Sequence, residues 1–169
     1  DQLIATTPVT NRVNLLGLNR QQLETFSTDL GAKRFRAQQV MKWIHHRGVR
    51  DFDEMTDLSQ SLRTQLGEIA EITPPNIAEQ HDSQDGTRKW AIAVDGGSLV
   101  EAVLIPEGDR ATLCVSSQVG CSLDCTFCST GKQGFQRDLT AAEIIGQVWL
   151  AINSYDAWQS GKGRVVTNV

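Results

Sequence analysis

The sequence predicts an α+β protein with helices first, short antiparallel strands next, and then the beginning of a β-α-β step. Apolar residues recur at helical spacing through the first third of the chain, and Pro74-Pro75 ends that pattern. After the prolines, apolar runs typical of strands alternate with glycine-rich turns. We therefore expect a helical domain over residues 1–73, a linker with antiparallel strands over 74–110, and the start of a β/α unit over 111–169.

Three helices account for the first part of the chain. The first begins at a capping box, in which Asn19 is the N-cap, and ends at Gly31, a residue suited to a left-handed conformation. The second spans residues 37–47, with Gly48 as its terminator. The third spans residues 57–70 behind a Thr56 cap. Their apolar stripes predict a small helical core.

Three strands are expected beyond the prolines. They cover Lys89–Val94, Leu99–Ile105 and Ala111–Ser116. The turns between them, 95–98 and 106–109, contain Gly, Asp or Pro and are short. Connections this short predict an antiparallel meander.

The last part of the chain predicts one β-α-β step. Thr140 and Glu143 form a second capping box, which starts a helix after a loop rich in Cys and Gly. Residues 164–169 then have the composition of a strand. A strand, a long loop, a helix and a new strand are typical of a parallel sheet, but one such step cannot close a barrel.

The composition indicates a folded protein outside membranes. Of its residues 40% are hydrophobic and 21% are charged, and no apolar run is long enough to span a bilayer. The first residues lack the features of a signal peptide. With four cysteines and no export signal, a reduced, cytoplasmic compartment is expected.

A basic stretch lies within this otherwise acidic chain, whose net charge is −4. Between Asp29 and Asp51 there is no acidic residue. A solvated helix face and a phosphate-contacting surface both explain such a stretch, and the composition does not decide between them. Its cations are Lys33, Arg34, Arg36, Lys42, Arg47 and Arg50.

The cysteines carry the strongest chemical signal. Cys121, Cys125 and Cys128 form a C-x3-C-x2-C motif, and thiolates at such spacing converge on one metal centre. Three ligands on a four-iron cluster leave one iron open for a small molecule. Zinc with Cys114 as fourth ligand, disulfides and unrelated buried thiols are the alternatives, each less consistent with the spacing and the compartment.

The surroundings of this motif resemble a known family. Phe127 precedes the last cysteine, as in radical S-adenosylmethionine enzymes. Further matching segments are 110–121, 128–131, 134–135, 35–40, 51–58, 85–87 and 89–90. On these segments the chain resembles the RlmN branch of the RlmN/Cfr RNA methyltransferases, from about residue 15 to residue 169.

The resemblance implies an enzyme that methylates C2 of adenosine in 23S ribosomal RNA and in transfer RNA. It implies a helix-hairpin-helix-like N-terminal domain that helps bind RNA, followed by a partial TIM barrel typical of radical S-adenosylmethionine enzymes. Cys121, Cys125 and Cys128 would hold a [4Fe-4S] cluster, and S-adenosylmethionine would bind its open iron close to Phe127. An electron-donating reductase or flavodoxin would be a partner.

The resemblance also implies roles for single residues. Cys114 matches the thiol that resolves a protein–RNA crosslink by forming a disulfide, although its position alone fits a small buried strand residue. Glu101 matches the carboxylate that accepts the C2 proton; from the sequence alone it is either a solvent-facing strand residue or a desolvated base in a pocket. The RNA contacts would come from Lys33, Arg34, Arg36 and Lys42.

Some features of the family do not occur in these 169 residues. A Gly-Met-Gly-Glu segment that helps hold S-adenosylmethionine is missing, as is a fifth cysteine to accept the methyl group. We therefore expect the N-terminal part of the enzyme, inactive by itself. The alternative is a non-catalytic RNA-binding module with a metal-stapled loop.

Overall fold

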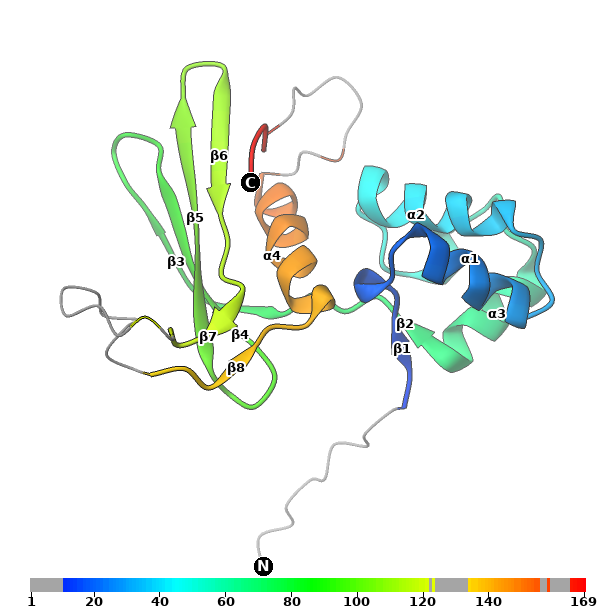
Figure 1. The fold of residues 1–169 in the computed structure, drawn as a ribbon. Coiled ribbons are helices and arrows are strands. Elements are labelled where there is room, and N and C mark those ends of the chain that lie inside the picture. The colour runs from blue at the N-terminus through cyan, green and yellow to red at the C-terminus, as the bar shows by residue number, and fades with distance from the viewer. Residues whose placement is uncertain (1–10, 122, 124–133, 156–157, 159–164) are drawn as a thin grey trace, which may run out of the picture.

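The computed structural model describes residues 11–121, 123, 134–155, 158 and 165–169. Within these residues it has a three-helix unit, a four-stranded antiparallel sheet and a fourth α-helix that lies between the two (Figure 1). This mixed α+β architecture is the one expected from the sequence. None of the described helices has the length and apolar character needed to cross a membrane.

The three-helix unit contains α1 (Arg20–Asp29), α2 (Phe35–Arg47) and α3 (Gln60–Ile69), with short 3-10 turns at Leu15–Gly17 and Phe52–Glu54. The first capping box is confirmed, because the Asn19 side chain accepts from the amide of Gln22 while the Gln22 side chain accepts from that of Asn19. Gly48 ends α2 in the left-handed region, with φ 63°. Buried aliphatic residues from all three helices form one core.

The third helix begins three residues later than expected. Ser59 is its N-cap and accepts from the amide of Leu62, so Thr56 lies in the preceding turn instead. That turn brings Met55 and Leu58 into the core, where they are 0% and 2% exposed. Burial of these two side chains therefore overrides the local capping signal at Thr56.

A short parallel pair extends the helical unit. Strand β1 (Val13–Asn14) pairs with β2 (Ala70–Glu71), the continuation of α3. The Asn14 side chain exchanges two hydrogen bonds with the backbone of Thr73. This pair fixes the segment that leads from the helices toward the sheet.

The main sheet consists of β3 (Asn76–Asp82), β4 (Arg88–Ala93), β5 (Leu99–Glu107) and β6 (Arg110–Cys114), antiparallel and in that order. The three expected strands are confirmed. Strand β3 was not expected, because all seven of its residues are exposed and show no apolar alternation. Strand β5 also continues through Pro106, which is still paired with Ala111 of β6. The pairing of β5 with β4 already ends at Leu104, so the amide that Pro106 lacks leaves no gap in the β4–β5 ladder.

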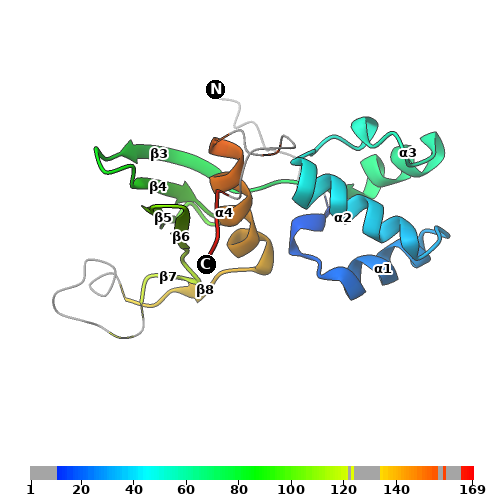
Figure 2. The same ribbon diagram turned by 90° about the horizontal axis from the view of Figure 1, so that it is seen from above.

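Helix α4 (Ala141–Ser154) packs against both units, as Figures 1 and 2 show. Its Trp149 donates an indole hydrogen bond to the carbonyl of Ile44 in α2, at 3.1 Å. Gly146 faces the Pro74-Pro75 linker so closely that a Cβ there would collide with the ring of Pro75. The expected capping box at Thr140 is confirmed.

The end of the chain lies beside β6. Asn168 forms a parallel bridge with Thr112, and the amide of Leu113 donates to its carbonyl at 2.9 Å. Strand β6, helix α4 and this returning segment therefore have the parallel arrangement expected for a β-α-β step. Between β6 and α4, β7 (Gln118–Val119) pairs with β8 (Arg137–Asp138).

Candidate functional site

The candidate site lies on the face of the sheet that α4 leaves open. On β5, Val100, Ala102 and Leu104 are buried in the core beneath α4, so the intervening side chains, Glu101 among them, project from the opposite face. A cavity of about 420 Å³ opens on that face where β5, β6 and the start of the cysteine-rich loop meet. Its lining includes Glu101, Cys114, Ser116, Gln118 and Gly120.

Glu101 lies on the wall of this cavity and is also open to solvent. Its side chain is 57% exposed and forms an ion pair with Lys89, with 2.6 Å between Nζ and Oε1. This exposure matches the solvent-facing interpretation of Glu101, while its place on the cavity wall is what a proton acceptor needs. The sequence did not reveal Lys89 as its partner, because the contact depends on the pairing of β4 with β5.

Cys114 lies in the same cavity, at the end of β6. It is directly opposite Val103, two residues along β5 from Glu101, so both side chains are on one face. Its thiol is exposed and free, and the thiol of Cys121 is free and half-buried, so the described part of the chain does not support the disulfide expected at Cys114. The structure thus brings together two site residues that are 13 positions apart.

Gln118 adds an unused acceptor to the cavity. Its side-chain oxygen is buried and has no hydrogen-bond partner among the described residues. A buried acceptor without a donor is costly, and such a group in a cavity wall is suited to a ligand N–H or O–H. No sequence pattern predicts this acceptor, because the burial of a single side-chain atom follows no periodicity.

Cys121 is the next residue after Gly120, which lies on the rim of the cavity. It is half-buried, and its sulfur accepts a hydrogen bond from the amide of Leu123 at 3.5 Å. Gly120, just before it, has φ 73°, and a Cβ there would collide with the carbonyl oxygen of Gly134. A glycine is therefore required where the loop begins.

The other two cysteines predicted to bind a cluster, Cys125 and Cys128, and Phe127, predicted to lie beside the cofactor, are outside the described residues. The described ranges contain no group of three His, Cys, Asp or Glu side chains arranged for a metal ion. The fit to a cluster therefore depends on the donor set itself, in which Cys121 is a free, accessible thiol. Thiolates of this kind suit iron–sulfur clusters.

The basic stretch is divided between structural and free cations. Arg34 pairs with Glu24, whose pKa is lowered by the hydrogen bonds from Arg34 and Arg20. Arg36 donates to the carbonyl of Asp57 at 2.9 Å. Lys33 and Lys42 are exposed and form no ion pair within the described residues.

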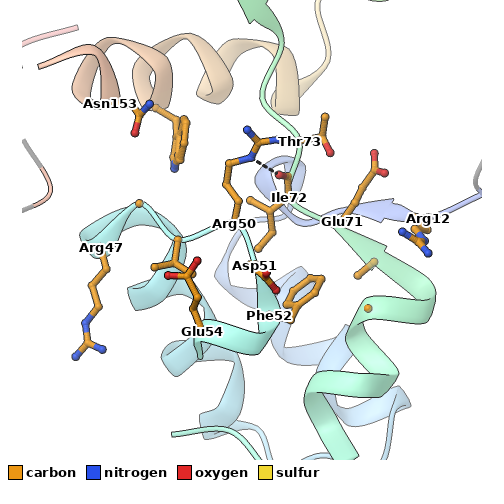
Figure 3. Close-up of a pocket in the computed structure, with 15 residues that line it drawn as sticks. Arg12, Arg47, Arg50, Asp51, Phe52, Glu54, Glu71, Ile72, Thr73 and Asn153 are labelled. Carbon is orange, nitrogen blue, oxygen red and sulfur yellow. Dashed lines mark hydrogen bonds between the residues drawn. The ribbon is translucent and has the colours of Figure 1, made fainter. Parts of the chain in front are cut away.

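A second cavity, of about 780 Å³, lies between the helical unit and α4 (Figure 3). Arg50 donates to the carbonyl of Ile72 at 3.1 Å, which ties the end of α2 to the segment after β2. Figure 3 shows Arg47 on the same wall, with its guanidinium directed away from Arg50. Both arginines come from the basic stretch, but they do not converge on one point.

Comparisons with known proteins agree with this picture. Residues 13–72 match the family described as the ribosomal RNA large subunit methyltransferase N-terminal domain. The dual-specificity RNA methyltransferase RlmN of Saccharophagus degradans is 58% identical over 166 residues, which are 98% of this chain and 42% of that protein. The protein of the same name from Marinobacter nauticus is 59% identical over 163 residues, 96% of this chain and 44% of its own length.

Among solved structures, the chain is similar to the crystal structure of a radical SAM methyltransferase from Sphaerobacter thermophilus. The TM-score is 0.79 at 36% identity, covering 92% of this chain and 45% of that one. The chain therefore spans less than half the length of the relatives it matches.

Proposed function

Since the chain corresponds to the N-terminal portion of the RlmN dual-specificity RNA methyltransferases, we propose that it carries the cluster loop, part of the catalytic cavity and an RNA-contacting surface of an adenosine-C2 methyltransferase. The substrates would be 23S ribosomal RNA and transfer RNA. An electron-donating reductase or flavodoxin would serve as partner.

One observation carries this proposal. Glu101 and Cys114 share a cavity whose rim, at Gly120, leads directly into Cys121. A proton acceptor, a resolving thiol and the first cluster ligand would thus serve one reaction centre. The side-chain oxygen of Gln118 on the same wall has no partner among the described residues and would supply a hydrogen-bond acceptor for the substrate or the cofactor.

The cofactors would be held by the loop that follows this cavity. Cys121, Cys125 and Cys128 would bind a [4Fe-4S] cluster, with S-adenosylmethionine at its open iron and Phe127 beside it. When bound there, this pair supplies one-electron chemistry that the protein side chains cannot perform. The amide of Leu123 already donates to the Cys121 sulfur, and hydrogen bonds of this type help set a cluster's reduction potential.

The protein groups then have distinct tasks. The Glu101 carboxylate accepts the C2 proton of adenosine, and Lys89 orients it through the ion pair. The exposed, free thiol of Cys114 attacks, as the thiolate, the sulfur of the methyl-accepting cysteine, so that an S–S bond forms, the S–C bond to the RNA breaks and its electron pair goes to the carbon, which takes up a proton. The methyl-accepting cysteine that this scheme needs would come from outside these 169 residues.

The RNA-contacting surface would lie on the helical unit. Lys33 supplies charge just before α2 and Lys42 in its middle, and Arg34 and Arg36 add charge while they also brace the helix. Phosphate contacts of this kind position a folded RNA without reading its bases.

Anaerobic reconstitution with iron and sulfide tests the proposal. We expect a brown chain with broad visible absorbance, whose reduced electron paramagnetic resonance spectrum changes when S-adenosylmethionine is added. A chain that instead binds zinc tightly and stays colourless would contradict it. That result would favour a non-catalytic RNA-binding module with a metal-stapled loop.

A further inference from the structure

Helix α4 contacts both ends of the segment that carries the cysteine motif. We define the loop neck as residues 116–120 and 134–139, the two described stretches that enter and leave this segment. Within the neck, β7 and β8 pair over only two residues each, and the amide of Leu139 donates to the carbonyl of Ser117 at 2.9 Å. A pair of strands this short is marginal by itself, so the neck depends on further contacts.

Gln147 supplies the contact at the entry. Its side chain is completely buried, and its amide bonds to both backbone groups of Ser116. The Ser116 amide donates to its Oε1 at 2.9 Å, and its Nε2 donates to the Ser116 carbonyl at 2.8 Å. Ser116 in turn donates through its hydroxyl to the carbonyl of Glu101, at 2.7 Å. One buried side chain therefore fixes the entry of the loop and, through Ser116, the cavity wall.

Glu143 supplies the contact at the exit, one helical turn earlier on α4. Its carboxylate accepts two hydrogen bonds from Arg137, at 2.8 and 2.9 Å, and one from the amide of Asp95 at 3.1 Å. Arg137 also donates to the Asp95 carbonyl at 2.7 Å. Glu143 is only 5% exposed, whereas the side chain of Arg137 is 35% exposed, so the carboxylate is buried while water reaches the guanidinium.

Core packing alone does not explain either residue. Both occupy buried positions on α4 where an aliphatic side chain would pack without any need for partners. A buried amide or carboxylate requires specific donors and acceptors in fixed positions, which restricts the backbone that provides them. For Gln147 that backbone is Ser116, in the loop neck. For Glu143 the neck contributes the side chain of Arg137, while the backbone donors are Asp95 and the N-cap Thr140.

Building on the proposed function, we propose that Gln147 and Glu143 are positioning residues for the cluster. Gln147 fixes the entry of the cysteine loop and Glu143, through Arg137, fixes its exit. Together they set the separation of the two described loop ends and so the position of Cys121, which directly follows the entry of the loop.

Amide hydrogen exchange on the cluster-free chain tests the two contacts separately. In Gln147→Met, which keeps the side chain's length, we expect the Ser116 amide to exchange about tenfold faster, because it loses its acceptor. In Arg137→Met we expect faster exchange at Gln136 and Val119 and an unchanged Ser116. Gln38→Met, on the exposed surface of α2, makes the same chemical change as a control.

The consequence for the cluster is tested after anaerobic reconstitution. We expect Gln147→Met to lose iron to a chelator several-fold faster than the Gln38→Met control, and its reduced spectrum to broaden. Unchanged exchange at Ser116, or exchange that rises equally in α3, would overturn the positioning role. Equal iron loss in the two variants would overturn its effect on the cluster. If the unaltered chain assembles no cluster, the proposed function fails, and the exchange data still decide the two contacts.

Discussion

Replacing Glu143 by Gln should destabilise the protein in a pH-dependent way. The change keeps the size of the side chain but removes the charge that Arg137 contacts with two hydrogen bonds. Those bonds are the main reason that the pKa of Glu143 falls from 4.5 to about 2. A shift of this size corresponds to roughly 3 kcal/mol of folding free energy at neutral pH. The side chain of Arg137 is 35% exposed, so water can replace part of the ion pair when the Glu143 charge is removed. We therefore expect Glu143→Gln to lower the free energy of unfolding by about 2 kcal/mol.

The sign of the pH dependence follows from the lowered pKa. The folded state holds the charged carboxylate, so the stabilisation is fully present above the unfolded pKa of 4.5 and is lost as the pH falls toward 2. Between pH 6 and pH 3 the contribution should shrink by more than half, a loss of roughly 1 kcal/mol. In Glu143→Gln this loss should be absent.

Urea unfolding at pH 7, 5 and 3 measures both effects. Glu68→Gln, at an exposed position in α3, serves as the matched control and should be neutral. A Glu143→Gln variant as stable as the unaltered chain at pH 7 would refute the reasoning. So would a difference that stays constant down to pH 3.

Two further predictions concern the packing of α4 and the RNA surface. Gly146→Ala should destabilise the fold by about 1–3 kcal/mol in thermal unfolding, because the new methyl group meets Pro75. Gly67→Ala, in open space on α3, is the control and should stabilise the fold by up to about 1 kcal/mol. Equal effects of the two substitutions would contradict the close contact at Gly146. Replacing Lys33 and Lys42 together by Gln should weaken transfer RNA binding in a titration and lower its salt slope by about 1–2; an unchanged slope would show that these lysines do not contact phosphate.

The helices could be predicted where local signals and burial agree. The capping boxes at Asn19 and Thr140 and the stop at Gly48 all occur as expected, because each depends on neighbours three or four residues away. The start of α3 could not be predicted in this way. It depends on Met55 and Leu58, which are buried by residues far away in sequence.

The candidate site, too, could be predicted from the sequence only in part. The cysteine spacing marks the loop, and the resemblance pointed to Glu101 and Cys114, which the sheet does bring to one cavity. The partner Lys89 and the two polar side chains of α4 that fix the loop neck were missed. Gln147 lies on a helix face that periodicity assigns to apolar residues, and only the path of the chain at Ser116 explains it.

The most direct test of the account is the iron and acid-labile sulfide content of three chains after anaerobic reconstitution. We predict about four of each per molecule for the unaltered chain and for Cys114→Ala, because Cys114 lies outside the cluster motif. Cys121→Ala should retain little of either. Equal loss in the two variants, or a chain that takes up zinc in place of iron, would contradict the assignment of the loop as a cluster site.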